Sequence, residues 1–295
     1  MIKRLRERRF RNLCFELAAS SKHIVVLGPT RSGKTTFVRN MARVLRRCCD
    51  FVILDMYGEY GGVVRPSVRP RIPFGPWLRN LAMVLRPASG GVEMTRAVYR
   101  ALRRAKGWAD FLAELERMTV DWELRRGASA VLSRVEPLHY AGVLVDAEAA
   151  IPQSCTVDFS QLNEEEKAYA MLMTLTWLFG GMRKWPRRRF IVVEEFRATL
   201  LGDQVTPVVA PMLDRVARTN HRLVIVTQSL PPNRDIRDTL LQQNIVVFHP
   251  GDVLAWQYYL NGFHRDVMSL KGHEALVYMA DQRKWKKLKV PETLD

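Results

Sequence analysis

The sequence lacks the features that would anchor it in a membrane or cross-link it. Its 295 residues contain no uninterrupted apolar run of about 18 residues, the length that a spanning helix needs. The strongly basic first twelve residues include no apolar segment, so no secretory signal is expected. Only four cysteines occur, without a CxxC pair and without a histidine placed to complete a zinc site. These absences exclude a disulfide-stapled miniprotein and predict a cytoplasmic protein with reduced, partly buried thiols.

Acidic residues are scarce relative to basic ones. The chain has 30 Asp and Glu against 46 Lys and Arg, a formal net charge of +16. Residues 1–49 hold thirteen basic residues and two acids, so +11 of this charge lies in the first sixth of the chain. Hydrophobic residues make up 47%, which is enough for a buried core. The charge balance favours a polyanionic partner.

Short apolar segments alternate with helical patterns along most of the chain. Strands are expected at His23–Leu27, Phe51–Leu54, Cys155–Phe159, Phe190–Val193, Leu223–Thr227 and Ile245–Phe248. Helices are expected at 2–20, 33–47, Asn163–Phe179, about 205–220 and Leu254–Gly262, with a closing hairpin at Glu274–Met279 and Trp285–Val290. Fully apolar strands that alternate with helices predict an α/β fold with a mainly parallel central sheet.

Two segments interrupt this alternation. Residues 61–76 contain four prolines and are interpreted as an ordered loop. Residues 77–150 show short helical patterns with breaks near Pro87–Gly91, Gly107 and Pro137, which predicts a helical insertion. Its tryptophans, Trp77, Trp108 and Trp122, are interpreted as local core and not as a platform for stacking bases.

A phosphate-binding motif lies between the first expected strand and the helix that follows it. The segment matches G-x-x-x-x-G-K-[ST] in full, at Gly28, Pro29, Thr30, Arg31, Ser32, Gly33, Lys34 and Thr35, with Thr36 next. Glycines let the backbone N–H groups wrap around phosphates, and the helix N-terminus favours negative charge. The lysine would bind the β and γ phosphates, and the Thr35 hydroxyl would ligate Mg²⁺. ATP with Mg²⁺ is therefore the expected ligand.

Polar residues follow two further apolar strands. Glu194 and Glu195 come directly after Phe190–Val193, which places them at the carboxyl end of a buried strand. We expect Glu194 to hold Mg²⁺ and Glu195 to polarise the attacking water. The alternative is a pair of solvated acids at a strand end. Gln228, just past Leu223–Thr227, could touch both the γ-phosphate and that water.

Together these segments resemble the HerA/FtsK superfamily of DNA-pumping ATPases. The resemblance rests on the Asp55-Met-Tyr-Gly58-Glu59-Tyr60 segment, the acid pair, the Thr227-Gln228 strand end, Gln243–Phe248 and Gly272–Leu276. It implies a RecA-like core at 22–76 and 151–295, with the insertion at 77–150 and a basic N-terminal helix at 1–21. It also implies a ring, usually hexameric, in which each ATP site is completed by an arginine in trans. Arg215 is favoured for this role and Arg218 is the alternative; either could instead lie on a solvated basic helix face.

Only about 22 residues precede the first strand, and Glu194 stands where the family more often has Asp. The chain is thus similar to compact genome-packaging ATPases of archaeal and membrane-containing viruses. We expect a viral or plasmid packaging motor that holds duplex DNA without reading its sequence, docks on a capsid or membrane protein, and works in the host cytoplasm or on the virion. The alternatives are a HerA-like repair or conjugation translocase and a P-loop ATPase of protein secretion or assembly. Candidate DNA contacts are the insertion and the Pro231–Arg237 segment. Lys3–Arg11 could clamp DNA, contact a neighbouring subunit or be solvated.

Overall fold

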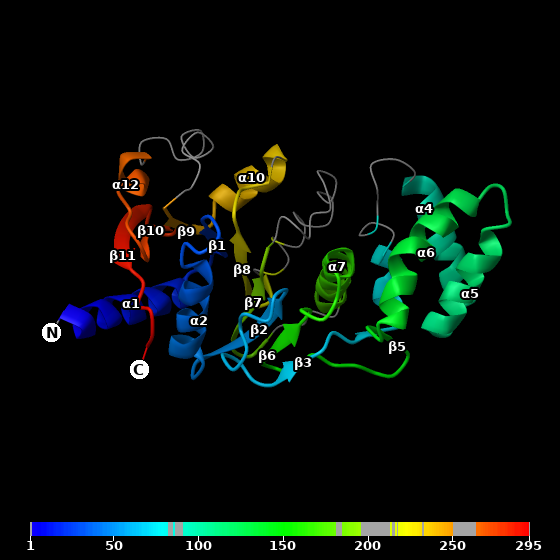
Figure 1. Ribbon diagram of the computed structural model, residues 1–295, viewed down its shortest axis with the longest axis horizontal. Coiled ribbons are helices and arrows are strands. Elements are labelled where there is room, and N and C mark those ends of the chain that lie inside the picture. The colour runs from blue at the N-terminus through cyan, green and yellow to red at the C-terminus, as the bar shows by residue number, and fades with distance from the viewer. Residues whose placement is uncertain are drawn as a thin grey trace.

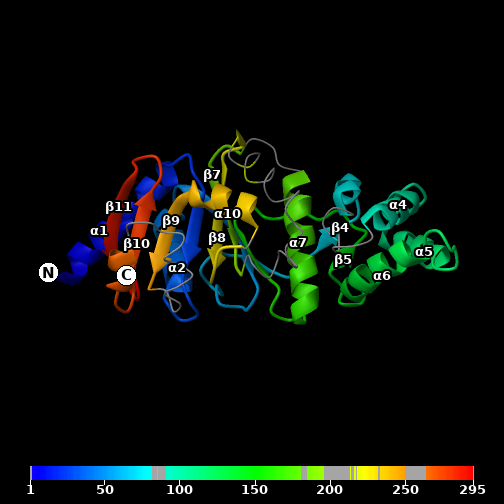
Figure 2. The same cartoon turned by 90° about the horizontal axis from the view of Figure 1, so that it is seen from above.

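A nine-stranded sheet runs through the molecule, with helices on both of its faces (Figures 1 and 2). The computed structural model describes residues 2–81, 91–180, 185–195, 218–231, 233–249 and 264–294, together with Leu85, Leu213 and Val216. The strand order is β11-β10-β9-β1-β8-β7-β2-β6-β3. All neighbours from β3 to β9 run parallel, whereas β9, β10 and β11 pair antiparallel. The predicted mainly parallel α/β sheet is confirmed.

Most boundaries lie close to the expected ones. The strands of the large sheet are β1 (Ile24–Leu27), β2 (Cys49–Asp55), β3 (Ser67–Val68), β6 (Cys155–Asp158), β7 (Arg188–Val193), β8 (His221–Thr227), β9 (Asn244–Phe248), β10 (Glu274–Met279) and β11 (Lys284–Lys289). The helices are α1 (Ile2–Ala19), α2 (Lys34–Leu45), η1 (Pro76–Asn80), α4 (Gly91–Leu102), α5 (Trp108–Met118), α6 (Arg125–Tyr140), α7 (Glu164–Gly180), α10 (Arg234–Leu241) and α12 (His264–Met268). A second sheet pairs β4 (Ile72–Pro73) with β5 (Leu144–Val145).

Successive side chains of the central strands enter two separate cores. In β1, Ile24 and Val26 pack with α1 and α2, whereas Val25 and Leu27 pack with the core that contains α7. All four are fully buried, because β1 has a parallel partner on each side and helices above and below. This double burial explains why the strands have uninterrupted apolar sequences. It also fixes the carboxyl end of β1, where the phosphate-binding motif begins.

The helices α4, α5 and α6 pack against one another beyond the small sheet, away from the large one (Figures 1 and 2). Gly127 of α6 lies so close to α4 that an added Cβ would be 2.5 Å from the carbonyl oxygen of Glu93. Trp108 is fully buried and donates from Nε1 to the Ile72 carbonyl at 3.0 Å, and Trp77 is 8% exposed. The expectation that Trp122 is core is wrong: it is 86% exposed, because it lies in the turn between α5 and α6, where none of the described elements covers it. The division into domains stays a prediction.

Three other expectations need correction. A loop is the simple expectation for the Pro231–Arg237 segment, but from Arg234 onward it is helical: Asn233 caps α10 by accepting a hydrogen bond from the Ile236 backbone N–H at 3.1 Å, and Ile236 and Leu240 are buried. Pro137 does not break a helix, since α6 continues through it for one more turn. The 61–76 segment contains the short strands β3 and β4. The helices expected at about 205–220 and at Leu254–Gly262 lie mostly or wholly outside the described residues.

No helix in the described ranges is long and apolar enough to cross a membrane.

Candidate functional site

The predicted phosphate-binding loop connects β1 to α2 at the carboxyl edge of the parallel strands. Gly33 has a φ of 110° and Arg31 a φ of 63°, so the turn uses the left-handed region twice. A Cβ on Gly28 would lie 2.6 Å from the Ser32 hydroxyl oxygen, so both glycines are required by the turn. The remaining predicted phosphate-binding residues lie in the same loop or in the first turn of α2: Pro29, Thr30, Ser32, Thr35 and Thr36.

Lys34 closes the loop from inside. Its Nζ donates hydrogen bonds to the carbonyl oxygens of Gly28 at 2.8 Å and Pro29 at 2.9 Å. The residue is buried, and burial lowers its pKa, while the carboxylates of Glu195 and Glu194 oppose that shift. The ammonium group thus lies between the loop and the acid pair, where it can exchange its carbonyl partners for phosphate oxygens.

Glu59, in the turn that follows β2, lies at the site although its position in the sequence predicts no role for it. Asp55 accepts backbone hydrogen bonds from Glu59 at 3.0 Å and Tyr60 at 2.8 Å, which fixes the turn between them. The turn brings Glu59 to the motif threonine, and the Thr35 hydroxyl donates to Glu59 Oε2 at 2.8 Å. Glu59 therefore reaches the proposed metal ligand directly. Its only signal in the sequence was the Gly58-Glu59 pair soon after a strand end.

Glu194 lies at the end of β7 and is only 3% exposed. Burial raises the pKa of its carboxyl group to about 8, and the charges of Asp55, Glu59 and Glu195 add to the shift. Its Oε2 is buried and has no hydrogen-bond partner within the described ranges. An unpartnered carboxylate oxygen among other acids fits a divalent cation, which would supply the missing partner and offset the repulsion.

Side chains in the described part of the chain do not form a complete cation site by themselves. No cluster of three or more His, Cys, Asp and Glu side chains in the described part of the chain is arranged to hold a metal ion. Mg²⁺ commonly keeps several waters and is held by one or two protein oxygens together with substrate phosphates. The oxygens of Thr35 and Glu194 fit that kind of shared coordination.

Glu195 and Gln228 come together across two neighbouring strands. Gln228 Nε2 donates to Glu195 Oε1 at 3.1 Å, which links the ends of β7 and β8. Glu195 has a φ of 44°, a left-handed conformation that is uncommon for a residue other than glycine. Such backbone strain is concentrated at functional sites, where surrounding contacts hold a side chain in place. The pair that the sequence predicted to handle water is therefore in direct contact.

The two candidate arginines have different outcomes. Arg215 lies outside the described residues. Arg218 is exposed and precedes β8, so it lies at the amino edge of the sheet. β8 has seven residues and runs parallel to β1, which separates Arg218 from the phosphate-binding loop of its own chain by roughly 20 Å. Arg218 therefore does not reach the phosphate-binding loop of its own chain.

Two further residues next to the loop were missed by sequence reasoning. An added Cβ on Gly33 would lie 3.2 Å from Nδ1 of His273 and 3.2 Å from Cε1 of Phe248. These residues come from β9 and the start of β10, which are remote from the motif in sequence. The His273 Nδ1 is buried and has no partner in the described ranges. Their approach to Gly33 follows from the strand order, which places β9 beside β1 and β10 beside β9.

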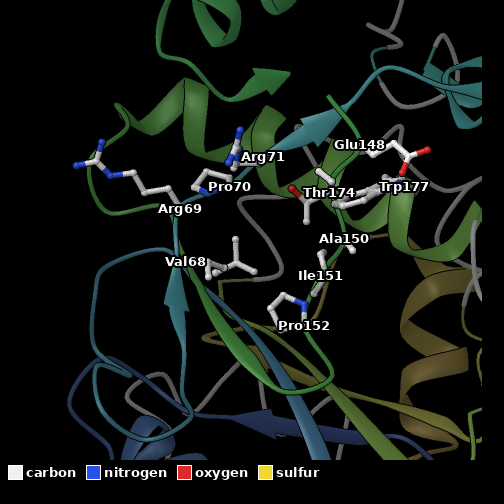
Figure 3. Close-up of a pocket in the computed structure, with 12 residues that line it drawn as sticks. Val68, Arg69, Pro70, Arg71, Glu148, Ala150, Ile151, Pro152, Thr174 and Trp177 are labelled. Carbon is white, nitrogen blue, oxygen red and sulfur yellow. The ribbon is translucent and has the colours of Figure 1, made fainter. Parts of the chain in front are cut away.

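A separate hollow lies where the helical insertion joins the sheet (Figure 3). It has a volume of about 290 Å³, and its lining includes Val68, Ile151, Thr174 and Trp177. The Thr174 hydroxyl is buried and has no partner within the described residues. The lining contains none of the predicted site residues, so the hollow is distinct from the phosphate-binding loop.

No protein-family model matches the chain, and no curated protein matches its sequence. Solved structures match over most of its length. VirB4 of Thermoanaerobacter pseudethanolicus superposes with a TM-score of 0.70 at 13% identity, covering 91% of this chain and 89% of that one. The plasmid coupling protein TrwB in complex with ADP and Mg²⁺ superposes with a TM-score of 0.71 at 16% identity, covering 94% and 86%. The genome packaging NTPase B204 from Sulfolobus turreted icosahedral virus 2 reaches a TM-score of only 0.45 at 14% identity, covering 91% of this chain and 97% of that one. At these identities the likeness shows the fold, and the predicted RecA-like α/β architecture is confirmed.

Proposed function

We propose that this chain hydrolyses ATP with Mg²⁺ and uses the energy to translocate DNA. The observation that carries the hydrolysis is the convergence of Lys34, Glu194, Glu195 and Gln228 beside the glycine-rich loop. Such a loop alone serves many nucleotide-binding proteins. The strained acid that contacts an amide across adjacent strands is what favours attack by water.

Each residue has a defined task in this proposal. Lys34 binds the β and γ phosphates, and Thr35 and Glu194 hold Mg²⁺, with Glu59 orienting the Thr35 hydroxyl. When bound, Mg²⁺ would neutralise charge on the phosphate oxygens. Glu195 accepts a hydrogen bond from the attacking water and so orients it.

Gln228 would connect hydrolysis to movement. Its amide donates to Glu195 now, and it can shift to the γ-phosphate when ATP binds. Two residues beyond it, Leu230 packs into the core, and α10 begins at Arg234. Both arginines pair with Asp238, Arg234 at 3.5 Å and Arg237 at 3.7 Å, but the Arg234 side chain is 84% exposed and that of Arg237 only 19%. Of the two arginines that the sequence suggested as DNA contacts, Arg234 is the better placed to reach a strand.

A ring is proposed because the site is incomplete in one chain. Arg218 lies at the sheet edge opposite the loop of its own chain, so it would serve a neighbour. Arg215 remains the alternative. An arginine supplied in trans stabilises charge in the transition state of phosphoryl transfer. We propose a hexamer by resemblance to the HerA/FtsK superfamily.

DNA is the proposed polymer because the chain carries a net charge of +16 and shares its fold with a plasmid coupling protein. The specific role that we propose is packaging of a viral or plasmid genome, with docking on a capsid or membrane protein in the host cytoplasm or on the virion. Conjugation or repair translocation is the second candidate, and the fold shared with TrwB, described as a bacterial conjugative coupling protein, favours conjugation within it. Protein secretion or assembly is the third.

Hydrolysis measured with and without duplex DNA, across a series of salt concentrations, tests the choice of polymer. A DNA translocase should be stimulated by duplexes of unrelated sequence, and the stimulation should fall steeply as salt rises, because phosphate contacts release counterions. Hydrolysis that DNA does not stimulate at any salt concentration would contradict DNA translocation and favour the secretion or assembly role.

A further inference from the structure

The edge of the sheet opposite the phosphate-binding loop carries a basic hollow. It has a volume of about 580 Å³ and lies between α1, the end of α2 and the residues that follow β2. Its charged lining residues are Arg11, Arg43, Arg46 and Arg47, and none of the described residues that line it is acidic. Because α2 has 12 residues, the hollow is about 18 Å from the start of that helix and from the loop.

Helix α1 extends this positive charge beyond the hollow. Phe10, Leu13 and Leu17 bury one face of α1 against the sheet and α2. Arg4, Arg8 and Arg11 follow each other at helical spacing on another face. All three are exposed at the surface. We call Arg4, Arg8, Arg11, Arg43, Arg46 and Arg47 the distal arginine track.

An aromatic ring lies within the track. Phe15 is one turn beyond Arg11 on the same face of α1; it lines the hollow and is 51% exposed. An exposed phenylalanine at this point adds nothing to the core, since the apolar face of α1 is already buried. Beside guanidinium groups it offers a flat surface for a base or a sugar.

The local needs of the fold account for only part of the track: Arg43 donates to the Asn40 side chain at 3.4 Å, and Arg11 also has a contact within the fold. Cations near the end of a helix interact favourably with its dipole, which explains Arg43 and in part Arg46. Elsewhere on this edge, Arg188 donates to the Ser20 carbonyl at 2.7 Å and Arg189 to the Pro152 carbonyl at 2.8 Å, so those arginines have structural partners. Neither a helix dipole nor a structural hydrogen bond explains Arg4 and Arg8, which lie along α1 away from its C-terminus.

The shape and spacing of the track suit a nucleic-acid backbone. Arg4 and Arg11 are seven residues apart, or roughly 10 Å along a helix, which is about the axial length of three successive phosphates of one duplex strand. Arginine binds phosphate through a forked pair of hydrogen bonds. A hollow accommodates a convex strand, whereas a flat lipid surface would meet only its rim.

The geometry points to the distal arginine track as a second nucleic-acid binding surface, which holds the phosphate backbone at the sheet edge away from the ATP site. This inference rests on the proposed DNA function and extends it. It gives the chain a DNA contact that is separate from any DNA contact coupled to Gln228. It also assigns six of the thirteen basic residues in the first 49 positions.

The test measures binding of a fluorescent 20-base-pair duplex by fluorescence anisotropy over a series of salt concentrations. The track variant is R11Q/R46Q/R47Q. The matched control, R79Q/R283Q/K284Q, removes the same charge from exposed positions outside the track. Loss of three phosphate contacts should reduce the slope of log K against log salt by about 2 to 3 and weaken binding at least about tenfold at 0.1 M salt. The control should keep the slope of the unaltered protein.

Three results would overturn the inference. Equal slopes for the track variant and the control would show that the track makes no particular contact. Loss of binding to phosphatidylserine vesicles with unchanged DNA binding would show that the surface serves a membrane. If the unaltered protein does not bind DNA, both the track and the DNA part of the proposed function are contradicted. If the unaltered protein, the track variant and the control bind DNA equally well, only the track is contradicted. Thermal unfolding of each variant confirms that it is folded.

Discussion

Glu194 is a carboxyl group whose surroundings disfavour its charge. Burial raises its pKa from the usual 4.5 to about 8 in the folded chain, so the folded state keeps a proton that the unfolded chain releases near pH 4.5. Between these two pH values the unfolded state is favoured increasingly, by at most roughly 1.4 kcal/mol per pKa unit. Without nucleotide or metal, Glu194 therefore costs stability as pH rises from about 5 to 8.

The variant E194Q tests this residue. Glutamine has similar shape and no charge, so the free energy of unfolding should fall less between pH 5 and pH 8 than it does for the unaltered protein. Urea unfolding at several pH values, in a chelator and without nucleotide, makes the measurement. The same change should weaken Mg²⁺-dependent hydrolysis, because the proposed cation loses a carboxylate. Parallel pH profiles for the two proteins would contradict the burial of a proton on Glu194.

Among individual residues, the sequence predicts those whose position depends on the residues next to them in the chain. The loop residues and Glu194 follow directly from a motif and from an apolar strand, so their positions could be predicted. Glu59 and His273 could not be assigned, because their contacts with Thr35 and Gly33 depend on a turn fixed by Asp55 and on the order of strands. Arg234 and Arg237 looked equivalent, and only the helix α10 distinguishes their exposure.

Among the elements, the contact between α4 and α6 depends on one glycine. Alanine is a better helix former than glycine by about 1 kcal/mol, so G127A would stabilise an isolated α6. In the folded chain the new Cβ would meet the Glu93 backbone at 2.5 Å, and backbone cannot move aside as a side chain can. We expect G127A to lower the free energy of unfolding by roughly 1–3 kcal/mol.

The control for this prediction is S129A on the same helix. Ser129 is exposed, so its replacement should leave stability within about 0.5 kcal/mol of the unaltered value. Chemical unfolding followed by circular dichroism compares the two variants. A G127A protein as stable as S129A would show that α4 and α6 do not pack as closely as described.

Element type was predictable wherever burial dominates, because strands covered on both faces have continuous apolar sequences. The start of α7 also has a local signal, a capping box in which Asn163 and Glu166 exchange hydrogen bonds at 3.0 and 2.9 Å. The eight residues of α10 bury only Ile236 and Leu240, too short a pattern to separate from a loop. Trp122 was misassigned because hydrophobicity alone does not tell whether an element exists to cover a side chain.

In the whole molecule, basic side chains lie at opposite edges of the central sheet. Lys34 lies at the carboxyl edge, and Arg218 and the distal arginine track lie at the amino edge. If subunits assemble into a ring, Arg218 should act on the ATP of a neighbour.

Mixing two variant proteins, R218A and E195Q, tests this prediction directly. R218A subunits keep Glu195, and E195Q subunits keep Arg218, so mixed rings regain an intact site at about a quarter of their interfaces.

Hydrolysis by each variant alone and by a one-to-one mixture measures this recovery. We expect both single variants to be nearly inactive and the mixture to be clearly active. A mixture no more active than its components would exclude Arg218 as the arginine that acts in trans. Recovery with R215A in place of R218A would then assign the role to Arg215.

The central claim is that one site, built around Glu195, hydrolyses ATP in response to DNA. Its most direct test is ATP hydrolysis by the unaltered protein and by E195Q, each with and without duplex DNA. We expect duplex DNA to stimulate the unaltered protein, and we expect E195Q to lose at least about a hundredfold in both conditions while still binding ATP. If E195Q hydrolyses ATP at the rate of the unaltered protein, Glu195 does not activate the water and the account of the site is wrong.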